Sequence, residues 1–254
     1  MLQLHSPSLL DTKTLPVLLV IFCATFIRSA FGFGEALVAV PLLALWLPIN
    51  VAAPLAVLVS ITIAGVVVIQ DWKKIHARST LWLVAATLPG IPLGIAMLTR
   101  LPPAAVKAVL GAFILTFSGY FLFLKQPPEL KNDSRRWLLG CGFLAGVLGG
   151  AYGMNGPPLV IYGAMRRWSA PHFRATLQGY FLPASLLGMA GYLAAGLWVP
   201  AITRYYLVSL PVVVPAIFLG RAVNQRLQGD VFLKLVYCGL MGIGLLLLSQ
   251  ALHR

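Results

Sequence analysis

Residues 31–41 read Phe31-Gly32-Phe33-Gly34-Glu35-Ala36-Leu37-Val38-Ala39-Val40-Pro41, and a similar segment follows later as Tyr152-Gly153-Met154-Asn155-Gly156-Pro157-Pro158-Leu159-Val160-Ile161. Each segment places helix-breaking glycine, proline or polar residues in the middle of an apolar run. In hydrocarbon, a freed backbone N–H or C=O group is costly unless protein or a water-lined cavity satisfies it. Two such breaks at matching places in two halves of a chain are typical of the binding site of a transporter.

The composition around these segments is that of a membrane protein. Of the 254 residues, 59% are hydrophobic and 10% are charged, and the mean hydropathy is +0.90. Apolar runs long enough to cross a bilayer recur from end to end. The net charge of +13 comes from basic residues scattered between these runs, a pattern that suits an anionic membrane leaflet and not nucleic acid. The sequence therefore predicts an all-α polytopic membrane protein.

The apolar runs divide the chain into two similar halves. The first half, 1–125, holds a short tail, a broken segment at 16–47 and three spans. The second half, 126–254, holds a broken segment at 137–162 and three further spans. The spans are predicted at 51–70, 81–98, 104–124, 177–195, 205–219 and 231–250.

Further similarity between the halves predicts an internal repeat. Leu88-Pro-Gly-Ile-Pro-Leu-Gly94 matches Val214-Pro-Ala-Ile-Phe-Leu-Gly220, and Arg100-Leu101 and Arg226-Leu227 then follow at the same offset. Glycine, proline and arginine in register are harder to obtain by chance than leucine. Gly142 and Gly146 have the spacing of close helix packing.

The distribution of basic residues predicts that this repeat is inverted. If each broken segment is a hairpin of two half-helices, three crossings remain in each half, and an odd number of crossings inverts the second half. The basic loops at 71–78, 125–136, 163–174 and 221–234 then share one side, in agreement with the positive-inside rule. These loops hold 13 of the 19 basic residues, namely Lys73, Lys74, Arg78, Lys125, Lys131, Arg135, Arg136, Arg166, Arg167, Arg174, Arg221, Arg226 and Lys234. We expect an inverted repeat, each half a broken-helix hairpin plus three transmembrane helices, with both termini outside.

Glu35 is the only acidic residue within a predicted membrane segment. It is either a proton carrier or the start of a half-helix, where a negative charge suits the positive end of the helix dipole. Arg28 lies seven residues earlier. It can pair with Glu35, face a substrate or extend to the membrane interface, and the sequence slightly favours the last.

The second break begins a helix with cap-like residues, because asparagine at a cap and proline in a first turn are ordinary there. Two half-helix N-termini aimed at one cavity would also bind an anion through backbone N–H groups, and we favour this interpretation. The predicted substrate-binding residues are Gly32, Phe33, Gly34, Gly153, Met154, Asn155, Gly156 and Pro157, and Glu35 and Arg28 are the predicted proton-coupling or anion-pairing residues.

Other polar residues in the spans, including Ser60, Gln178, Tyr180 and Ser185, are interpreted as structural, since most such side chains bond to a neighbouring helix. The four histidines lie in tails or loops, and no pair has metal-ligand spacing. We therefore expect no metal site, no cofactor and no enzyme activity.

A Gly-rich break followed by a Leu/Val-Pro run, once in each half of a chain of this length, resembles the TauE/SafE sulfite exporter family. The resemblance covers residues 16–250. It implies a multi-pass secondary transporter of the bacterial inner membrane that exports a small sulfur-containing anion, such as sulfite or an organosulfonate, with proton coupling left open. The partners it implies are that anion and the lipid bilayer; the oligomeric state is not predicted.

The chain departs from the family pattern at both breaks. Family members commonly carry Gly-x-Gly-Gly-Gly in each half, whereas here Gly34 is followed by Glu35-Ala36 and Gly153-Met154 by Asn155-Gly156-Pro157. The departure concerns the substrate more than the fold. A transporter of a different small organic anion and a non-transporting membrane assembly protein therefore remain as alternatives.

Overall fold

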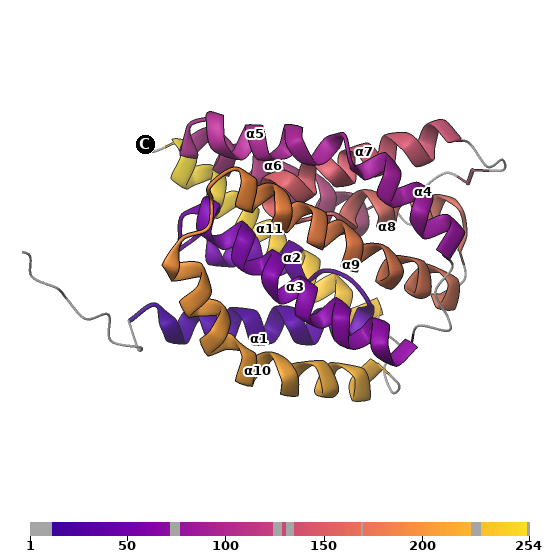
Figure 1. The fold of residues 1–254 in the computed structure, drawn as a ribbon, viewed down its shortest axis with the longest axis horizontal. Helices are drawn as coiled ribbons and strands as arrows, with labels where there is room; N and C mark the ends of the chain where they lie inside the picture. The colour runs from indigo at the N-terminus through magenta and orange to yellow at the C-terminus, as the bar shows by residue number, and fades with distance from the viewer. Residues whose placement is uncertain are drawn as a thin grey trace, which may run out of the picture.

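The computed structural model describes residues 12–71, 77–123, 129–130, 135–168, 170–224 and 230–252. This part of the chain is all helical, and the helices interlock in one bundle (Figure 1). They are α1 (Thr14–Phe31), α2 (Glu35–Leu43), α3 (Ile49–Asp71), α4 (Ala77–Thr87), α5 (Gly90–Arg100), α6 (Pro103–Phe123), α7 (Arg135–Tyr152), α8 (Gly156–Met165), α9 (Ala170–Ala194), α10 (Pro200–Asn224) and α11 (Asp230–Leu252). The tail before residue 12, the pair Arg226-Leu227 and parts of the basic loops lie outside the described residues.

Both predicted breaks are present. α1 ends at Phe31 and α2 begins at Glu35, while α7 ends at Tyr152 and α8 begins at Gly156. The chain turns through glycines with left-handed backbone conformations, with φ of 85° at Gly32, 97° at Gly34 and 69° at Gly153. Glycine adopts this region at little cost, whereas residues with a Cβ atom do not.

In each broken segment the two helices that flank the break also contact each other. The arms are unequal, because α1 has 18 residues and α2 has nine, while α7 has 18 and α8 has ten. The prediction of a half-helix is therefore wrong for α1, since α1 is long and apolar enough to cross a membrane by itself.

Three more helices, α3, α6 and α10, are also long and apolar enough to cross a membrane. The predicted span at 81–98 consists of two helices, α4 and α5, bent by 40° at Leu88-Pro89, which together are apolar enough to form one broken span. Proline removes a backbone donor and its ring clashes with an earlier carbonyl group, so a kink at this position has a local cause. By contrast, α10 continues through Pro211 and Pro215.

Extensive contacts join the two halves of the chain. α1 packs on α10, α5 on α7, α3 on α9, and α6 on α11. The contact between α5 and α7 is the tightest described: a Cβ atom on Gly94 would lie 2.1 Å from the carbonyl oxygen of Val147, and one on Gly146 would lie 3.0 Å from Cα of Gly90. The Cβ atom on Gly146 would also lie 2.2 Å from the carbonyl oxygen of Thr87, at the end of α4. The predicted close packing at Gly146 is confirmed. The start of α1 and the end of α11 lie at the same end of the bundle (Figure 1).

Candidate functional site

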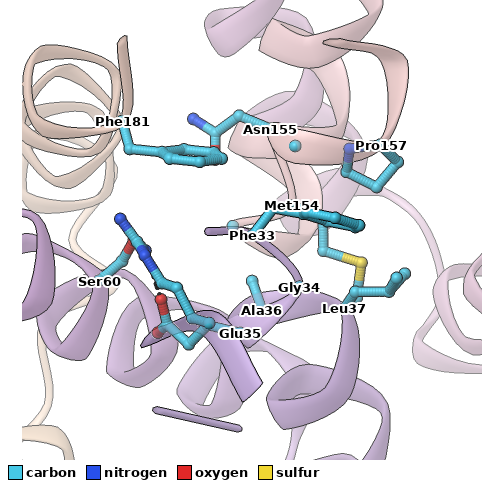
Figure 2. A pocket seen from close by; sticks show the side chains of 13 residues that line it. Phe33, Gly34, Glu35, Ala36, Leu37, Ser60, Met154, Asn155, Pro157 and Phe181 are labelled. Atoms are coloured by element: carbon cyan, nitrogen blue, oxygen red, sulfur yellow. Dashed lines mark hydrogen bonds and ion pairs between the residues drawn. The ribbon is translucent and has the colours of Figure 1, made fainter. Parts of the chain in front are cut away.

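The two breaks line one cavity between α1, α2, α3, α8 and α9 (Figure 2). Its lining residues are Arg28, Phe33, Gly34, Glu35, Ala36, Leu37, Ser60, Gly153, Met154, Asn155, Gly156, Pro157 and Phe181. The structure thus brings together every residue of the predicted site except Gly32. The carbonyl oxygen of Gly32 instead accepts a hydrogen bond from Nε2 of Gln178 at 3.3 Å.

The cavity is small in this conformation. Its volume for solvent is about 20 Å³, and one water molecule needs roughly 10–15 Å³ by the same measure. An oxyanion with four or more heavy atoms therefore requires the lining side chains to move apart. Phe33, Met154 and Phe181 are the large apolar side chains that enclose the space (Figure 2).

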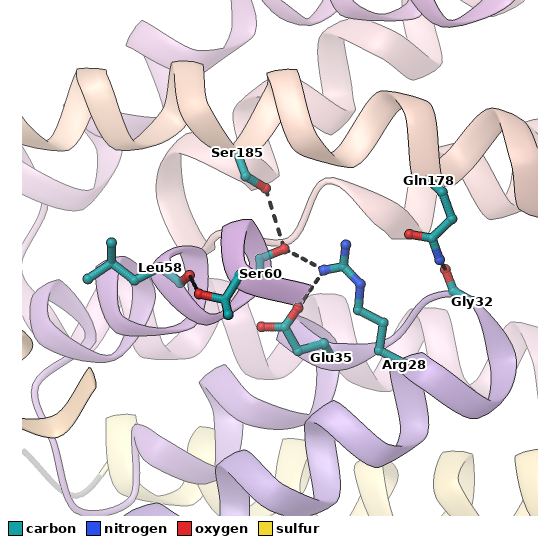
Figure 3. A network of polar contacts seen from close by, with 8 residues as sticks. Arg28, Gly32, Glu35, Leu58, Ser60, Gln178 and Ser185 are labelled. Atoms are coloured by element: carbon teal, nitrogen blue, oxygen red, sulfur yellow. Dashed lines mark hydrogen bonds and ion pairs between the residues drawn. The ribbon is translucent and has the colours of Figure 1, made fainter. Parts of the chain in front are cut away.

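Arg28 and Glu35 form a buried ion pair across the first break (Figure 3). Nη1 of Arg28 donates to Oε2 of Glu35 at 2.6 Å, and the two side chains are 3% and 2% exposed. Nη1 also donates to Oγ of Ser60, and the guanidinium carbon lies 4.6 Å from the ring centroid of Phe181. The expectation that Arg28 extends to the interface is wrong, because the break folds the start of α2 back against the last turn of α1.

Several polar atoms of this pair have no partner among the described residues. Nε and Nη2 of Arg28 and Oε1 of Glu35 are buried without a hydrogen bond. Leaving such atoms unsatisfied is costly, and intramembrane ionisable groups are commonly functional for that reason. The unpartnered Nε and Nη2 atoms form the edge of a guanidinium group that binds oxyanions with two parallel hydrogen bonds.

The N-terminus of α2 adds backbone donors to the same place. Gly34 at its cap position makes no side-chain capping bond, and the first backbone bond back to it comes from Val38 at 3.1 Å. The N–H groups of Glu35, Ala36 and Leu37 therefore have no partner within the helix. Together with the positive end of the helix dipole, they favour an anion in the cavity.

The second break is built differently. Asn155 makes no capping hydrogen bond with α8, so its side chain is not an ordinary helix cap. Its amide lies beside Gly149 and interacts with the hydroxyl of Tyr180. Pro157 and Pro158 follow in the first turn of α8 and carry no N–H group. The start of α8 therefore offers fewer backbone N–H groups than the start of α2 does.

Four lining residues are not among the predicted site residues: Ala36 and Leu37, which follow Glu35 in α2, and Ser60 and Phe181 on other helices. Ser60 was interpreted as structural, although it touches Arg28 and also accepts a bond from Ser185 at 3.4 Å. Its polarity within a span was the available signal. Phe181 gave no signal, because an aromatic side chain in an apolar span is ordinary.

The family model described as "Sulfite exporter TauE/SafE" matches residues 17–247 of the chain. The chain is also 24% identical over 238 residues to a protein of Cupriavidus necator named "Probable sulfite/organosulfonate exporter TauE", with 90% of this chain and 91% of that protein covered. No solved structure is significantly similar to the chain.

Proposed function

Because the chain belongs to the sulfite exporter TauE/SafE family of membrane transporters, we propose that it exports a small sulfur-containing anion, sulfite or an organosulfonate, across the bacterial inner membrane. The observation that carries this proposal is the single cavity lined by both helix breaks and by the buried pair of Arg28 and Glu35. The name of the Cupriavidus necator relative supports the choice of substrate.

The chemistry of the cavity suits an oxyanion. The free edge of Arg28 presents two donors in a plane, and the first turn of α2 presents backbone N–H groups. Sulfite and sulfonate groups offer three oxygen atoms around sulfur, so one anion can accept from both sets of donors. Glu35 is the one carboxylate of the described lining residues and is the proposed site of proton coupling.

The pairing of helices supports an inverted repeat with halves 1–125 and 126–254. If α1 corresponds to α7 and α10 to the bent pair of α4 and α5, the contacts α1–α10 and α5–α7 are the same contact made twice. The pairs α3–α9 and α6–α11 then each join corresponding helices. Such an arrangement allows one half to rock against the other around a central site, as in other transporters built from inverted repeats.

A thermal-shift panel on the detergent-purified full chain tests this proposal. A ligand that binds only the folded protein raises its apparent stability. We expect sulfite or the sulfonate isethionate to raise the melting temperature of the wild type and not that of Arg28→Gln. Arg167→Gln is the matched control, because Arg167 is a surface arginine outside the cavity, and this variant should respond as the wild type does.

The other outcomes of the panel favour the alternatives. A response to carboxylates alone would indicate a transporter of a different organic anion. A flat response from folded protein, together with no isethionate or sulfite flux in proteoliposomes, would favour a membrane assembly protein without transport activity.

A further inference from the structure

We infer that the transported anion and one proton bind together, with the anion at the free edge of Arg28 and the proton on Oε1 of Glu35, and that both cross the membrane in the same direction. This inference rests on the proposed function and adds the sign and the stoichiometry of proton coupling. No covalent bond forms or breaks apart from the O–H bond on Glu35, and solvent on the side from which the anion enters supplies the proton.

The charge balance of the cavity is the first argument. Arg28 and Glu35 form a neutral pair, and no other charged side chain is among the described residues that line the cavity. An anion added to this pair would leave two negative charges facing one positive charge. Two like charges about 5 Å apart, at an effective dielectric constant of about 20, repel strongly enough to weaken binding by roughly a few hundredfold. A proton on Glu35 removes this penalty.

The positions of the unpartnered atoms are the second argument. Nη1 of Arg28 is already engaged by Glu35 and Ser60, whereas Nε and Nη2 have no partner among the described residues. An oxyanion can therefore bind Arg28 without displacing Glu35. Oε1 of Glu35 also lacks a partner there, so a proton on this atom breaks no existing hydrogen bond and supplies a donor beside the anion.

The surroundings of Glu35 leave this residue as the group that takes up a proton when the anion binds. The helices that pack against α2 are α1, α3, α6 and α11. The charged and titratable residues described on them are Arg28 in the ion pair, Lys107, which donates to Gln250, and Tyr120 and Tyr237, whose rings contact Phe121. Cys23 on α1 and Cys238 on α11 are exposed, and the side chains of Asp71, Asp230 and Lys234 lie outside the described residues. From α9, the neighbouring Ser185 and Gln178 are uncharged.

The consequence concerns the driving force. A sulfonate carries one negative charge, so a sulfonate and one proton cross as a neutral pair. An inward proton gradient then opposes export, and outward transport is driven by the concentration gradient of the anion itself. If binding of the proton excluded the anion, the two would cross in opposite directions and an inward proton gradient would drive export of the anion.

Isethionate is a suitable probe, because a sulfonate stays ionised over the whole working pH range. We would titrate it into the purified full chain by calorimetry in two buffers of different ionisation enthalpy, which counts the protons taken up. We expect uptake approaching one proton per anion. By linkage, the dissociation constant should rise by about tenfold per pH unit where Glu35 is ionised in the empty protein.

Glu35→Gln mimics the protonated side chain and should bind isethionate without proton uptake and without this pH dependence. Glu129→Gln is the matched control, because Glu129 is 58% exposed and its ion pair with Arg167, at 4.0 Å, lies on the surface. It should behave as the wild type does. Wild-type binding without proton uptake, or equal uptake by Glu35→Gln, would overturn the inference.

Two further measurements keep the outcome decisive. If Glu35→Gln does not fold, the pH dependence of the wild-type dissociation constant decides alone, and a constant value from pH 5 to 9 overturns the inference. In proteoliposomes, an inward isethionate gradient should make the external medium alkaline, whereas acidification contradicts co-transport. If no anion of the thermal-shift panel binds, the proposed function itself fails.

Discussion

The two helix breaks share one cavity but differ in what holds them. At the first break, a Cβ atom on Gly34 would lie 3.6 Å from Ile27, an ordinary contact, and the buried pair of Arg28 and Glu35 spans the turn. At the second break, a Cβ atom on Gly153 would lie only 2.8 Å from Cγ2 of Val57, and prolines take the place of backbone donors. The first break therefore provides charge and hydrogen-bond donors, whereas the second provides a packed wall.

The largest expected effect follows from breaking the ion pair. Arg28→Met leaves the carboxylate of Glu35 buried without a partner, and the loss of one member of a buried pair typically costs about 3–5 kcal/mol. The double variant Arg28→Met/Glu35→Gln removes both charges and should regain most of that stability. Neither variant should bind isethionate or sulfite.

Unfolding of the two variants in detergent, followed by thermal melts with and without ligand, checks this prediction. A double variant as unstable as the single one would show that the destabilisation does not come from an unpaired charge. Retained anion binding by the folded double variant would remove Arg28 from the site.

The second comparison sets the glycines of the two breaks against each other. Gly34→Ala forces a left-handed conformation on a residue with a Cβ atom, at roughly 1–2 kcal/mol. Gly153→Ala carries the same strain, and the contact with Val57 should add roughly 1–3 kcal/mol of overpacking. Val57→Ala should rescue part of the loss in Gly153→Ala and none of it in Gly34→Ala. Equal stabilities of the two glycine variants, measured by thermal unfolding, would contradict a tighter second break.

The breaks themselves could be predicted from sequence, because glycines and prolines inside an apolar run act locally on the backbone. The kink at Pro89 could not be separated from the continuous path of α10 through Pro211 and Pro215. All three prolines lie in predicted apolar spans, yet Pro89 falls in the turn between α4 and α5 whereas Pro211 and Pro215 lie inside α10. Local sequence does not contain that information.

The site residues that lie on the breaks could be predicted because the breaks themselves could be, whereas residues that reach the cavity through helix packing could not. The glycines, prolines and polar residues that interrupt the apolar runs identify the residues on the breaks. The inward direction of Arg28 depends on how α2 folds back, and an arginine near a helix end is compatible with either direction. Ser60 and Phe181 reach the cavity only through the packing of α3 and α9, which lie far from the breaks in sequence.

Asn155 tests whether the second break is held by side-chain packing or by capping. A true cap residue is replaceable by serine and costs about 1 kcal/mol when changed to alanine. Because Asn155 interacts with Tyr180 instead, Asn155→Ser and Asn155→Ala should lose similar stability. In the background of Tyr180→Phe, the cost of Asn155→Ala should fall by about 1 kcal/mol, the value of a typical hydrogen bond. Additive losses in this double-mutant cycle, or rescue by serine, would restore the capping interpretation.

The smallest expected effect is a gain at the second break. Pro157 lines the cavity and Pro158 does not, although both lie in the first turn of α8. Pro157→Ala restores one N–H group at a helix N-terminus beside the proposed anion, where such a charge interaction contributes about 0.3–1 kcal/mol. Isethionate should therefore bind roughly two- to fivefold more tightly by calorimetry.

Pro158→Ala is the matched control, because it gives up the same rigidity and restores an N–H group at a residue that does not line the cavity. Its affinity for isethionate should equal that of the wild type. Both variants should lose similar, small amounts of stability, since each frees one proline position in the unfolded chain. Equal affinities of the two variants would mean that the start of α8 does not face the anion, and that the donors of the first break bind it alone.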